Sequence, residues 1–366
     1  MTLTNYWWLL IWLVFVGGLL AAVVPKKPVQ VLDKTEYRWS WGASLLLACP
    51  YVIWAANRGN IGDTYAYQMI FRNIPAIGNG LRAYLLTNEK DRGFTVLISC
   101  LKSIIGDSEV LLFFIIAAFQ MFCIIYFFRK YSTNFLLCVS MFILSTDYIS
   151  WMFNGIRQFI AVCIILLSFE LILRKKVLWA IAVILLAATF HASALIMIPL
   201  IFVIQGRAWN WRTLILLGCV CVATLLIDSF TALLDSVLAE TQYNDLITNE
   251  LWTNDDGTNI LRALFYSIPA LLSLAGIRCV KQEKSPVVSL CVNCSICTAA
   301  LYFLSVFSSG IYVGRLPIYT TLQGYVAVPW LIDHMFTKQS AKIVTGGLIC
   351  GYLVFFYYQM HAWGIM

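Results

Sequence analysis

Charged residues are scarce in this sequence, and their scarcity excludes a broad class of protein. Asp, Glu, Lys and Arg make up 12% of the 366 residues, against 61% hydrophobic residues and a mean hydropathy of +0.82. A soluble domain carries about twice that share of charge. Apolar runs also recur at the length of a membrane span, so we expect an all-α, polytopic integral membrane protein.

The sequence also lacks the usual marks of nucleotide, nucleic-acid and metal sites. It has no glycine-rich phosphate loop, and its net charge of +7 is dispersed over short loops. Most of the twelve cysteines lie in apolar runs, where a thiol packs as a small side chain. Cys291, Cys294 and Cys297 follow one helical stripe, which we interpret as a packing surface. We therefore expect no metal, no cofactor and no nucleic-acid partner.

Twelve apolar runs are candidate transmembrane helices, and we expect them to form a single polytopic membrane domain over 1–366. The first run has no basic leading segment, so we interpret it as a span rather than a cleaved signal. The runs lie near 6–24, 39–57, 110–128, 135–153, 159–173, 177–190, 192–205, 213–229, 263–277, 287–308, 316–332 and 343–360.

Two segments differ from a plain span. Residues 93–106 place apolar and polar side chains on opposite faces at helical spacing, which predicts a short amphipathic helix, interfacial or re-entrant. Residues 177–205 as one helix would measure about 44 Å, longer than a bilayer core of roughly 30 Å. We therefore expect a break at His191 and two short spans that form a hairpin.

The distribution of basic residues predicts the orientation in the membrane. With the choices above, the Lys and Arg clusters of the short loops fall on one face, which the positive-inside rule assigns to the cytoplasm. Both termini and two long loops, 58–109 and 230–262, then lie outside. Long loops in compact proteins are usually functional, and the basic residues left outside run against the orienting bias.

The stretch RGNIGDTYAY, residues 58–67, is one candidate site in the first long loop. Gly59 and Gly62 permit a tight turn, and Asp63 suits the N-cap of a helix that begins at Thr64. Capping does not explain Arg58, which lies in the same turn at the end of a span. Arg58 and Asp63 are therefore candidates for substrate contact, with capping and interface anchoring as the alternative.

The stretch FNGIRQ, residues 153–158, offers a candidate anion site. Asn154 suits the N-cap of the following helix, so Arg157 is expected in its first turn, beside backbone N–H groups that favour phosphate. Snorkelling of Arg157 to lipid headgroups is the alternative. His191 interrupts an apolar run, as cavity-lining residues often do, although a hydrogen-bonded structural histidine is the default interpretation.

Two further outer segments supply polar side chains. NEKDRGF, residues 88–94, offers Glu89, Asp91 and Arg92, for which surface ion pairing is an equal alternative. Arg315 lies at the start of a span, flanked by Tyr312 and Tyr319, which could stack on a sugar or join the aromatic belt. Together the outer arginines suit a doubly charged phosphate group attached to a lipid, because arginine binds such oxygens bidentately.

Five motifs resemble, in their order and spacing, the EpsG family of Wzy-type bacterial polysaccharide polymerases: RGNIGDTYAYQMIF, EKDRGFTVL, FNGIRQFIAVCI, FHASALIMIP and GRLPIY. The resemblance covers roughly residues 40 to 330. It implies a fold related to the GT-C glycosyltransferases. It also implies that repeat units carried on undecaprenyl pyrophosphate are joined into O-antigen, capsule or exopolysaccharide at the outer face of the bacterial cytoplasmic membrane. The expected partners are this lipid-linked oligosaccharide and membrane lipid, with a chain-length regulator and a flippase as further ones.

Our hypothesis for the reaction is an inverting transfer that needs no metal, because arginines can supply the positive charge. Arginines are expected to neutralise the departing pyrophosphate, while His191 or Asp63 accepts the proton of the attacking hydroxyl. A flippase of the same lipid-linked units, an O-antigen ligase and a non-catalytic assembly scaffold are the alternatives. The catalytic candidates are His191, Asp63 and Glu89, and the substrate-binding candidates are Arg58, Arg92, Arg157, Arg315, Tyr312 and Tyr319.

Overall fold

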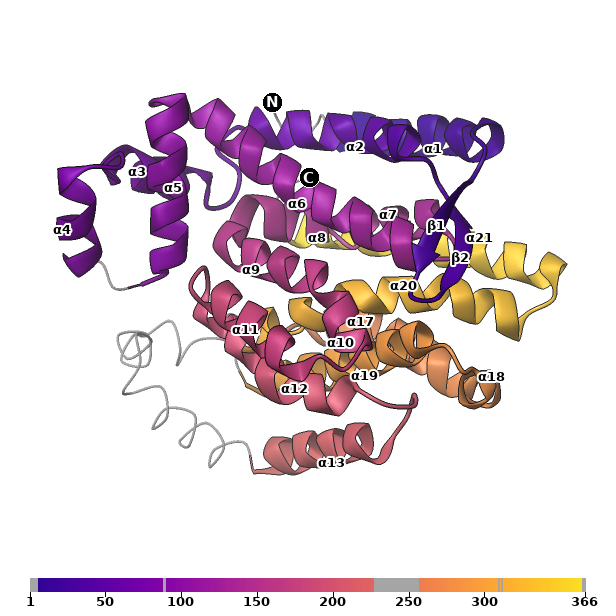
Figure 1. The fold of residues 1–366 in the computed structure, drawn as a ribbon. Coiled ribbons are helices and arrows are strands. Elements are labelled where there is room, and N and C mark those ends of the chain that lie inside the picture. Colours follow the sequence, from indigo (N-terminus) through magenta and orange to yellow (C-terminus); the bar gives the residue numbers. More distant parts are fainter. Residues whose placement is uncertain (1–5, 88–89, 227–256, 309, 311, 364–366) are drawn as a thin grey trace. The chain divides into compact units, whose positions relative to one another are not determined.

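The computed structural model describes residues 6–87, 90–226, 257–308, 310 and 312–363. The chain divides into two compact units, which are described separately (Figure 1). The first unit contains residues 1–195 and 339–366, and the second contains residues 196–338. The expected second long loop, 230–262, lies mostly outside the described residues.

The first unit is built from helices that follow the apolar runs. These helices are α1 (Tyr6–Val23), α2 (Trp41–Ala56), α6 (Glu109–Tyr131), α7 (Phe135–Leu144), α9 (Ile156–Leu167), α10 (Phe169–Leu173), α11 (Val177–Ala188) and α21 (Lys338–Ala362). Helix α6 has 23 residues and begins at Ser108, whose side chain accepts a hydrogen bond from the Leu111 N–H. It ends in Arg129 and Lys130, whose charges suit a helix C-terminus.

A short β-hairpin interrupts the helical fold of the first unit. Strands β1 (Lys27–Val31) and β2 (Lys34–Arg38) pair antiparallel, with Lys27 opposite Arg38. Two residues connect the strands, and the first of them, Leu32, has a φ of +54°. The protein is thus nearly all helical, consistent with the all-α prediction. The hairpin is an exception in a loop where alternating polar and β-branched residues favour strands.

The predicted span at 135–153 is broken in the structure. Helix α7 ends at Leu144, and the next helical segment is bent from it by 71°. That segment consists of α8 (Asp147–Ile149) and the π-helix η2 (Ser150–Asn154), and Thr146 at the break has a φ of +68°. The break turns the chain so that η2 ends at the site described below.

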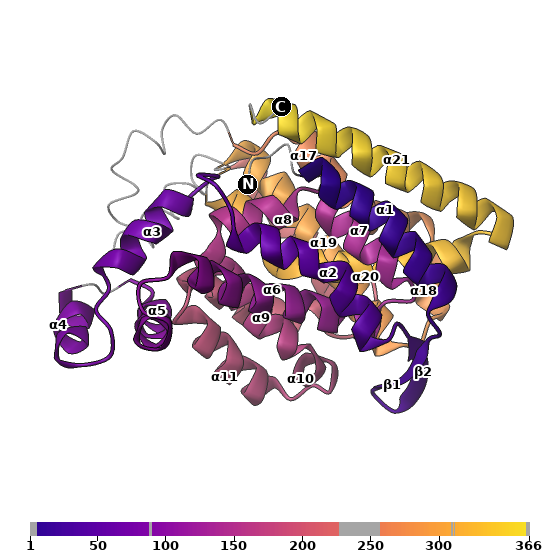
Figure 2. The same cartoon turned by 90° about the horizontal axis from the view of Figure 1, so that it is seen from above.

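Helices α3 (Thr64–Asn73), α4 (Asn79–Thr87) and α5 (Arg92–Ile105) occupy the first long loop. In both views they form a group at one end of α2 and α6 (Figures 1 and 2). Helix α5 confirms the amphipathic prediction for 93–106, but its polar face is turned inward. Lys102 donates hydrogen bonds to the carbonyls of Phe71 and Arg72 at the end of α3, at 3.0 and 2.9 Å, and Ser99 donates to the carbonyl of Pro75. The polar stripe of α5 therefore binds the C-terminus of α3.

The second unit packs around α19 (Pro286–Phe307). Its other elements are α12 (Met197–Ile204), α13 (Trp211–Leu225), α17 (Ile260–Ala275), α18 (Ile277–Gln282), η4 (Val313–Arg315) and α20 (Ile318–Met335). The 3₁₀ turn η3 (Ala192–Ile196) ends the first stretch of the first unit in the sequence. The predicted break near His191 is confirmed, because α11 ends at Ala188 and η3 begins at Ala192. Fully buried Asn293 of α19 braces the turn after α12 by donating to the carbonyl of Ile204.

All twelve predicted apolar runs contain helix, but their lengths differ. Within the described residues, four helices are long and apolar enough to cross a membrane, and the bent pair at 135–154 makes a fifth if counted as one span. These helices make the protein a membrane protein. The count of twelve spans and the GT-C relationship stay predictions.

Candidate functional site

Four segments far apart in the sequence meet in the first unit. The backbone N–H of Asp63, just before α3, donates to Asn154 Oδ1 at 2.9 Å. Arg157 of α9 forms an ion pair with Asp91, just before α5, at 2.5 Å. The backbone N–H of Gly93 donates to the carbonyl of Thr189, just after α11, at 2.8 Å. These contacts join the 58–67, 91–94, 154–157 and 189–193 segments in one site.

Arg58 is a buried residue next to this site. Its Nε donates to the carbonyl of Ala55 at 2.6 Å and its Nη1 to the carbonyl of Met152 at 2.8 Å. The guanidinium lies between the rings of Phe113 and Phe153, at 4.3 and 4.4 Å from their centroids. Burial lowers the pKa of Arg58 to about 10, so it remains a cation at neutral pH. Its contacts fasten the end of α2 to the π-helix η2.

Asn154 has a different role from the one the sequence predicted. The residue at the N-cap of α9 is Gly155, and Asn154 does not cap that helix with its side chain. Its Oδ1 instead accepts the Asp63 N–H, while its backbone carbonyl accepts a 3.2 Å hydrogen bond from the Tyr67 hydroxyl. The prediction failed because the π-turn directs the Asn154 side chain toward the loop before α3. Asn154 therefore orients the Asp63 backbone.

Asp63 lies at the predicted N-cap position, but its side chain has another environment. It is exposed and makes no capping hydrogen bond to α3 among the described residues. The preceding Gly62 has a φ of +57°, which permits the turn that the sequence predicted. Capping therefore does not account for the Asp63 carboxylate.

Arg157 lies in the first turn of α9, as the sequence predicted. Its side chain is 35% exposed, whereas that of its partner Asp91 is 10% exposed. Burial raises the pKa of Asp91, and the Arg157 charge opposes that rise. Burial also raises the pKa of Tyr67, again opposed by Arg157, so the guanidinium lies close to this phenol as well. The pair places a cation with an accessible edge against a buried acid.

His191 follows the tip of α11 and is half-buried. Its Nδ1 lies 2.6 Å from Ser193 Oγ, and the backbone N–H of Ser193 points to the same nitrogen at 3.4 Å. The N–H can only donate, so this geometry makes Nδ1 an acceptor and places the ring proton on Nε2. The Thr189 to Gly93 hydrogen bond fixes the tip of α11 against α5.

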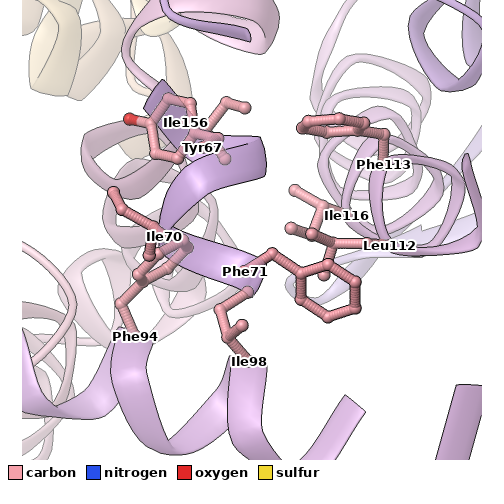
Figure 3. A pocket seen from close by; sticks show the side chains of 9 residues that line it. All are labelled: Tyr67, Ile70, Phe71, Phe94, Ile98, Leu112, Phe113, Ile116 and Ile156. Atoms are coloured by element: carbon pink, nitrogen blue, oxygen red, sulfur yellow. The ribbon is translucent and has the colours of Figure 1, made fainter. Parts of the chain in front are cut away.

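An apolar cluster packs next to the site. Figure 3 shows side chains of α3, α5, α6 and α9 converging on one another. The space left between them is about 10 Å³, which is the room of one water molecule, so the cluster is a packed core and not a ligand cavity. It consists of Tyr67, Ile70, Phe71, Phe94, Ile98, Leu112, Phe113, Ile116 and Ile156.

Comparison with known proteins assigns the chain to a family. The model of the EpsG family matches residues 43–364, which is nearly the whole chain. The chain belongs to the EpsG family. No curated protein and no solved structure matches it. Membership supports a polysaccharide polymerase-like role in general terms.

Two candidates in the 88–94 segment of this EpsG-family chain have separate outcomes. Glu89 lies outside the described residues. Arg92 is exposed at the start of α5 and lines an open groove of about 510 Å³ together with Arg82 and apolar residues of α4. Arg92 thus faces a different surface from its neighbour Asp91, which contacts Arg157.

The remaining candidates belong to the second unit. Arg315 is exposed at the end of η4, and Tyr312 is half-buried. Tyr319 is 1% exposed in α20, so its ring offers almost no surface to a sugar or to lipid. In the described parts of the EpsG-family chain, no cluster of three or more His, Cys, Asp or Glu side chains could hold a metal ion.

Sequence reasoning named Asp91 beside Glu89 and Arg92 but did not include it among the candidate site residues. Surface ion pairing was the alternative for this segment, and the partner of Asp91 could not be identified from the sequence. The available signal was the position of Asp91 just before an amphipathic helix. Its partner lies 66 residues away along the chain.

Proposed function

We propose that the protein is a glycosyltransferase that joins lipid-diphosphate-linked oligosaccharide units into a polysaccharide. The placement of Arg157 carries the proposal. Its guanidinium lies in the first turn of a helix, beside Tyr67 and buried Asp91, where the ends of three other helices meet. Arginine matches phosphate oxygens bidentately, and the start of a helix adds backbone N–H groups of the same polarity. Membership of the EpsG family supports the same reaction class.

The proposed reaction is a displacement at the anomeric carbon of the donor. An acceptor sugar hydroxyl forms the new C–O bond, the bond to the diphosphate breaks, and the lipid diphosphate leaves. Arg157 neutralises the charge that develops on the leaving oxygen, which preorganised cations do without reorganisation at the moment of reaction. Arg58 acts as a positioning residue, because it holds the π-turn from which Asn154 reaches Asp63.

The remaining candidate residues receive supporting roles in this proposal. Arg315 and Tyr312, in the second unit, and exposed Arg92 are proposed to bind substrate, each on its own surface. The site faces the exterior of the bacterial cytoplasmic membrane, and the carrier is undecaprenyl pyrophosphate. A flippase that delivers the units and a chain-length regulator are the proposed protein partners.

Asp63 is the proposed acceptor of the hydroxyl proton. The tautomer of His191 carries its proton on Nε2, so His191 donates a hydrogen bond to the substrate in this scheme. Asp63→Asn should lower turnover about a hundredfold while the melting temperature stays unchanged, because no capping hydrogen bond to α3 is lost in the described structure. Product ladders and thermal unfolding measure the two effects. Near-wild-type ladders would remove Asp63 from the chemistry.

Purified protein in nanodiscs with synthetic lipid-diphosphate repeat units tests the function directly. Ladders of lengthened glycan on the lipid support a polymerase. Transbilayer movement of the units without lengthening would identify a flippase instead. Transfer to a lipid A core acceptor without ladders would identify a ligase.

A further inference from the structure

The Asp91–Arg157 ion pair has an uneven exposure that bears on ligand choice. Asp91 Oδ2 lies 2.5 Å from Arg157 Nη1, and the acid is the more buried partner, at 10% against 35% exposure. A ligand therefore approaches from the arginine side. An anion that binds the Arg157 guanidinium must replace its charge-assisted contact with Asp91. The anion then lies next to the desolvated carboxylate of Asp91.

The backbone around Asp91 is held in place by its neighbours. Asp91 has a φ of +51°, a conformation that few residues other than Asn, Asp and Gly adopt. Two residues later, the Gly93 N–H donates to the carbonyl of Thr189. A Cβ at Gly93 would collide with Thr189 Oγ1, so these two segments are in contact with no space for a side chain between them. Because this backbone is held and the Arg157 side chain is the longer and more exposed of the two, we expect ligand binding to draw Arg157 away from Asp91.

We infer that Asp91 is a specificity-determining residue that reserves Arg157 for doubly charged diphosphate groups and excludes singly charged phosphodiesters. The inference rests on the proposed function and refines its donor group. A phosphodiester brings one negative charge, the same as the carboxylate that it would displace, so the exchange gains little. A diphosphate brings more charge and more acceptor oxygens to the same guanidinium. The distinction matters at a membrane surface, where phospholipid headgroups are phosphodiesters in great excess.

The test is calorimetric titration of the purified full-length protein with two probes, inorganic diphosphate and dimethyl phosphate. Wild type should bind diphosphate and show no measurable heat with dimethyl phosphate. Asp91→Asn keeps the shape of the side chain and its tolerance for positive φ but removes the charge. This variant should bind both probes, and its preference for diphosphate should fall about tenfold or more.

Two further variants complete the design. Asp107→Asn removes an exposed acid of the same unit, whose side chain is 86% exposed, and should leave both affinities unchanged. Arg157→Gln should abolish the binding of diphosphate, and Asp91→Asn combined with Arg157→Gln should bind neither probe. An unchanged preference in Asp91→Asn, or loss of diphosphate binding by an Asp91→Asn variant that is still folded, would overturn the inference.

The inference and the proposed function fail in distinguishable ways. If no glycan ladder forms but Asp91→Asn gains dimethyl phosphate binding, the specificity role stands and the polymerase does not. If ladders form and the preference is unchanged, the polymerase stands and the role of Asp91 falls.

Discussion

The site of the first unit and the core of the second unit bury polar groups in opposite ways. Around Arg157 the backbone is irregular: Gly62 and Asp91 have positive φ, and a π-helix ends at Asn154. Charged side chains are held there by backbone carbonyls, aromatic rings and each other. In the second unit, α19 and α20 are regular helices joined by neutral pairs such as Thr298 and Thr320, whose hydroxyls are 2.8 Å apart.

The difference shows where a helical membrane protein can place charge. In a regular helix the backbone N–H and C=O groups bond to one another, so few carbonyls remain to accept a hydrogen bond from a buried guanidinium. A broken span frees carbonyls, and one of them, on Met152, accepts a hydrogen bond from Arg58. Activity should therefore depend on the irregular site of the first unit, whereas changes in the regular core should affect stability alone.

The largest expected effect follows from removing Arg157. Arg157→Gln should lower the polymerisation rate about a hundredfold, which corresponds to roughly 3 kcal/mol of transition-state stabilisation. Arg157→Lys should recover part of the rate, because it keeps the charge and loses the planar fork. Initial rates of ladder formation measure both. Arg72→Gln, which removes an exposed arginine paired with Glu109, is the control and should retain wild-type rates.

A second change tests the turn that presents Asp63. Gly62→Ala adds a Cβ that would lie 2.6 Å from Asn154 Oδ1, at a φ of +57°. It should destabilise the protein by about 2 kcal/mol and lower polymerisation, since it displaces the Asn154 side chain. Gly106→Ala is the matched control, because Gly106 has a φ of +65° with nothing near its Cβ. This variant should lose stability but keep its polymerisation rate. An equal loss of polymerisation rate in both variants would contradict the role of Asn154.

The cysteine stripe of α19 tests the other side of the comparison. Cys291, Cys294 and Cys297 are fully buried. Their replacement by Ala together should cost about 2 kcal/mol of unfolding free energy through small cavities, a drop of a few degrees in melting temperature, with full activity. Loss of activity in a protein that still folds, together with loss of bound metal, would show that the stripe is a site and not a packing surface.

The smallest expected effect is the pH dependence that Asp91 confers on stability. Burial raises the pKa of this carboxyl above its ordinary value of 3.8. Its contribution to stability is therefore complete below the pKa of the unfolded chain and is lost as pH rises through the higher pKa of the folded protein. As pH rises, the melting temperature of Asp91→Asn should therefore increase relative to that of wild type. Thermal unfolding of both proteins from pH 3.5 to about 7 measures this difference. A constant difference across the series would contradict it.

Much of the fold could be predicted from hydropathy. All twelve apolar runs contain helix, the amphipathic helix α5 lies where its periodicity placed it, and the break near His191 follows from the length of a bilayer. These features depend on neighbouring residues, which a single sequence displays. The β-hairpin at 27–38 was missed because its short alternating strands lie in a loop otherwise interpreted by charge alone.

The site could be predicted only in part, for a physical reason. Arg157 in a first helical turn is a local feature, and the structure has it there. The partner of Arg157 and the true role of Asn154 depend on contacts across 66 and 91 residues, which no spacing in the sequence encodes. The π-turn was equally invisible, because its five residues carry no compositional mark.

That π-turn also makes the site sensitive to the length of the chain. The Gly155 N–H donates to the carbonyl of Ser150, so this turn contains one residue more than an α-helical turn would need. A π-turn and an α-turn each close one full turn, so deleting one residue from 150–154 would let the turn close as an ordinary α-turn while α9 keeps nearly the same phase around its axis. The Asn154 side chain, which the π-turn directs toward the Asp63 N–H, would lose that direction, whereas Arg157 would keep its place in the first turn of α9. A single-codon deletion here should therefore do what no conservative substitution does: separate the loop before α3 from the anion-binding arginine without changing any residue that either contacts.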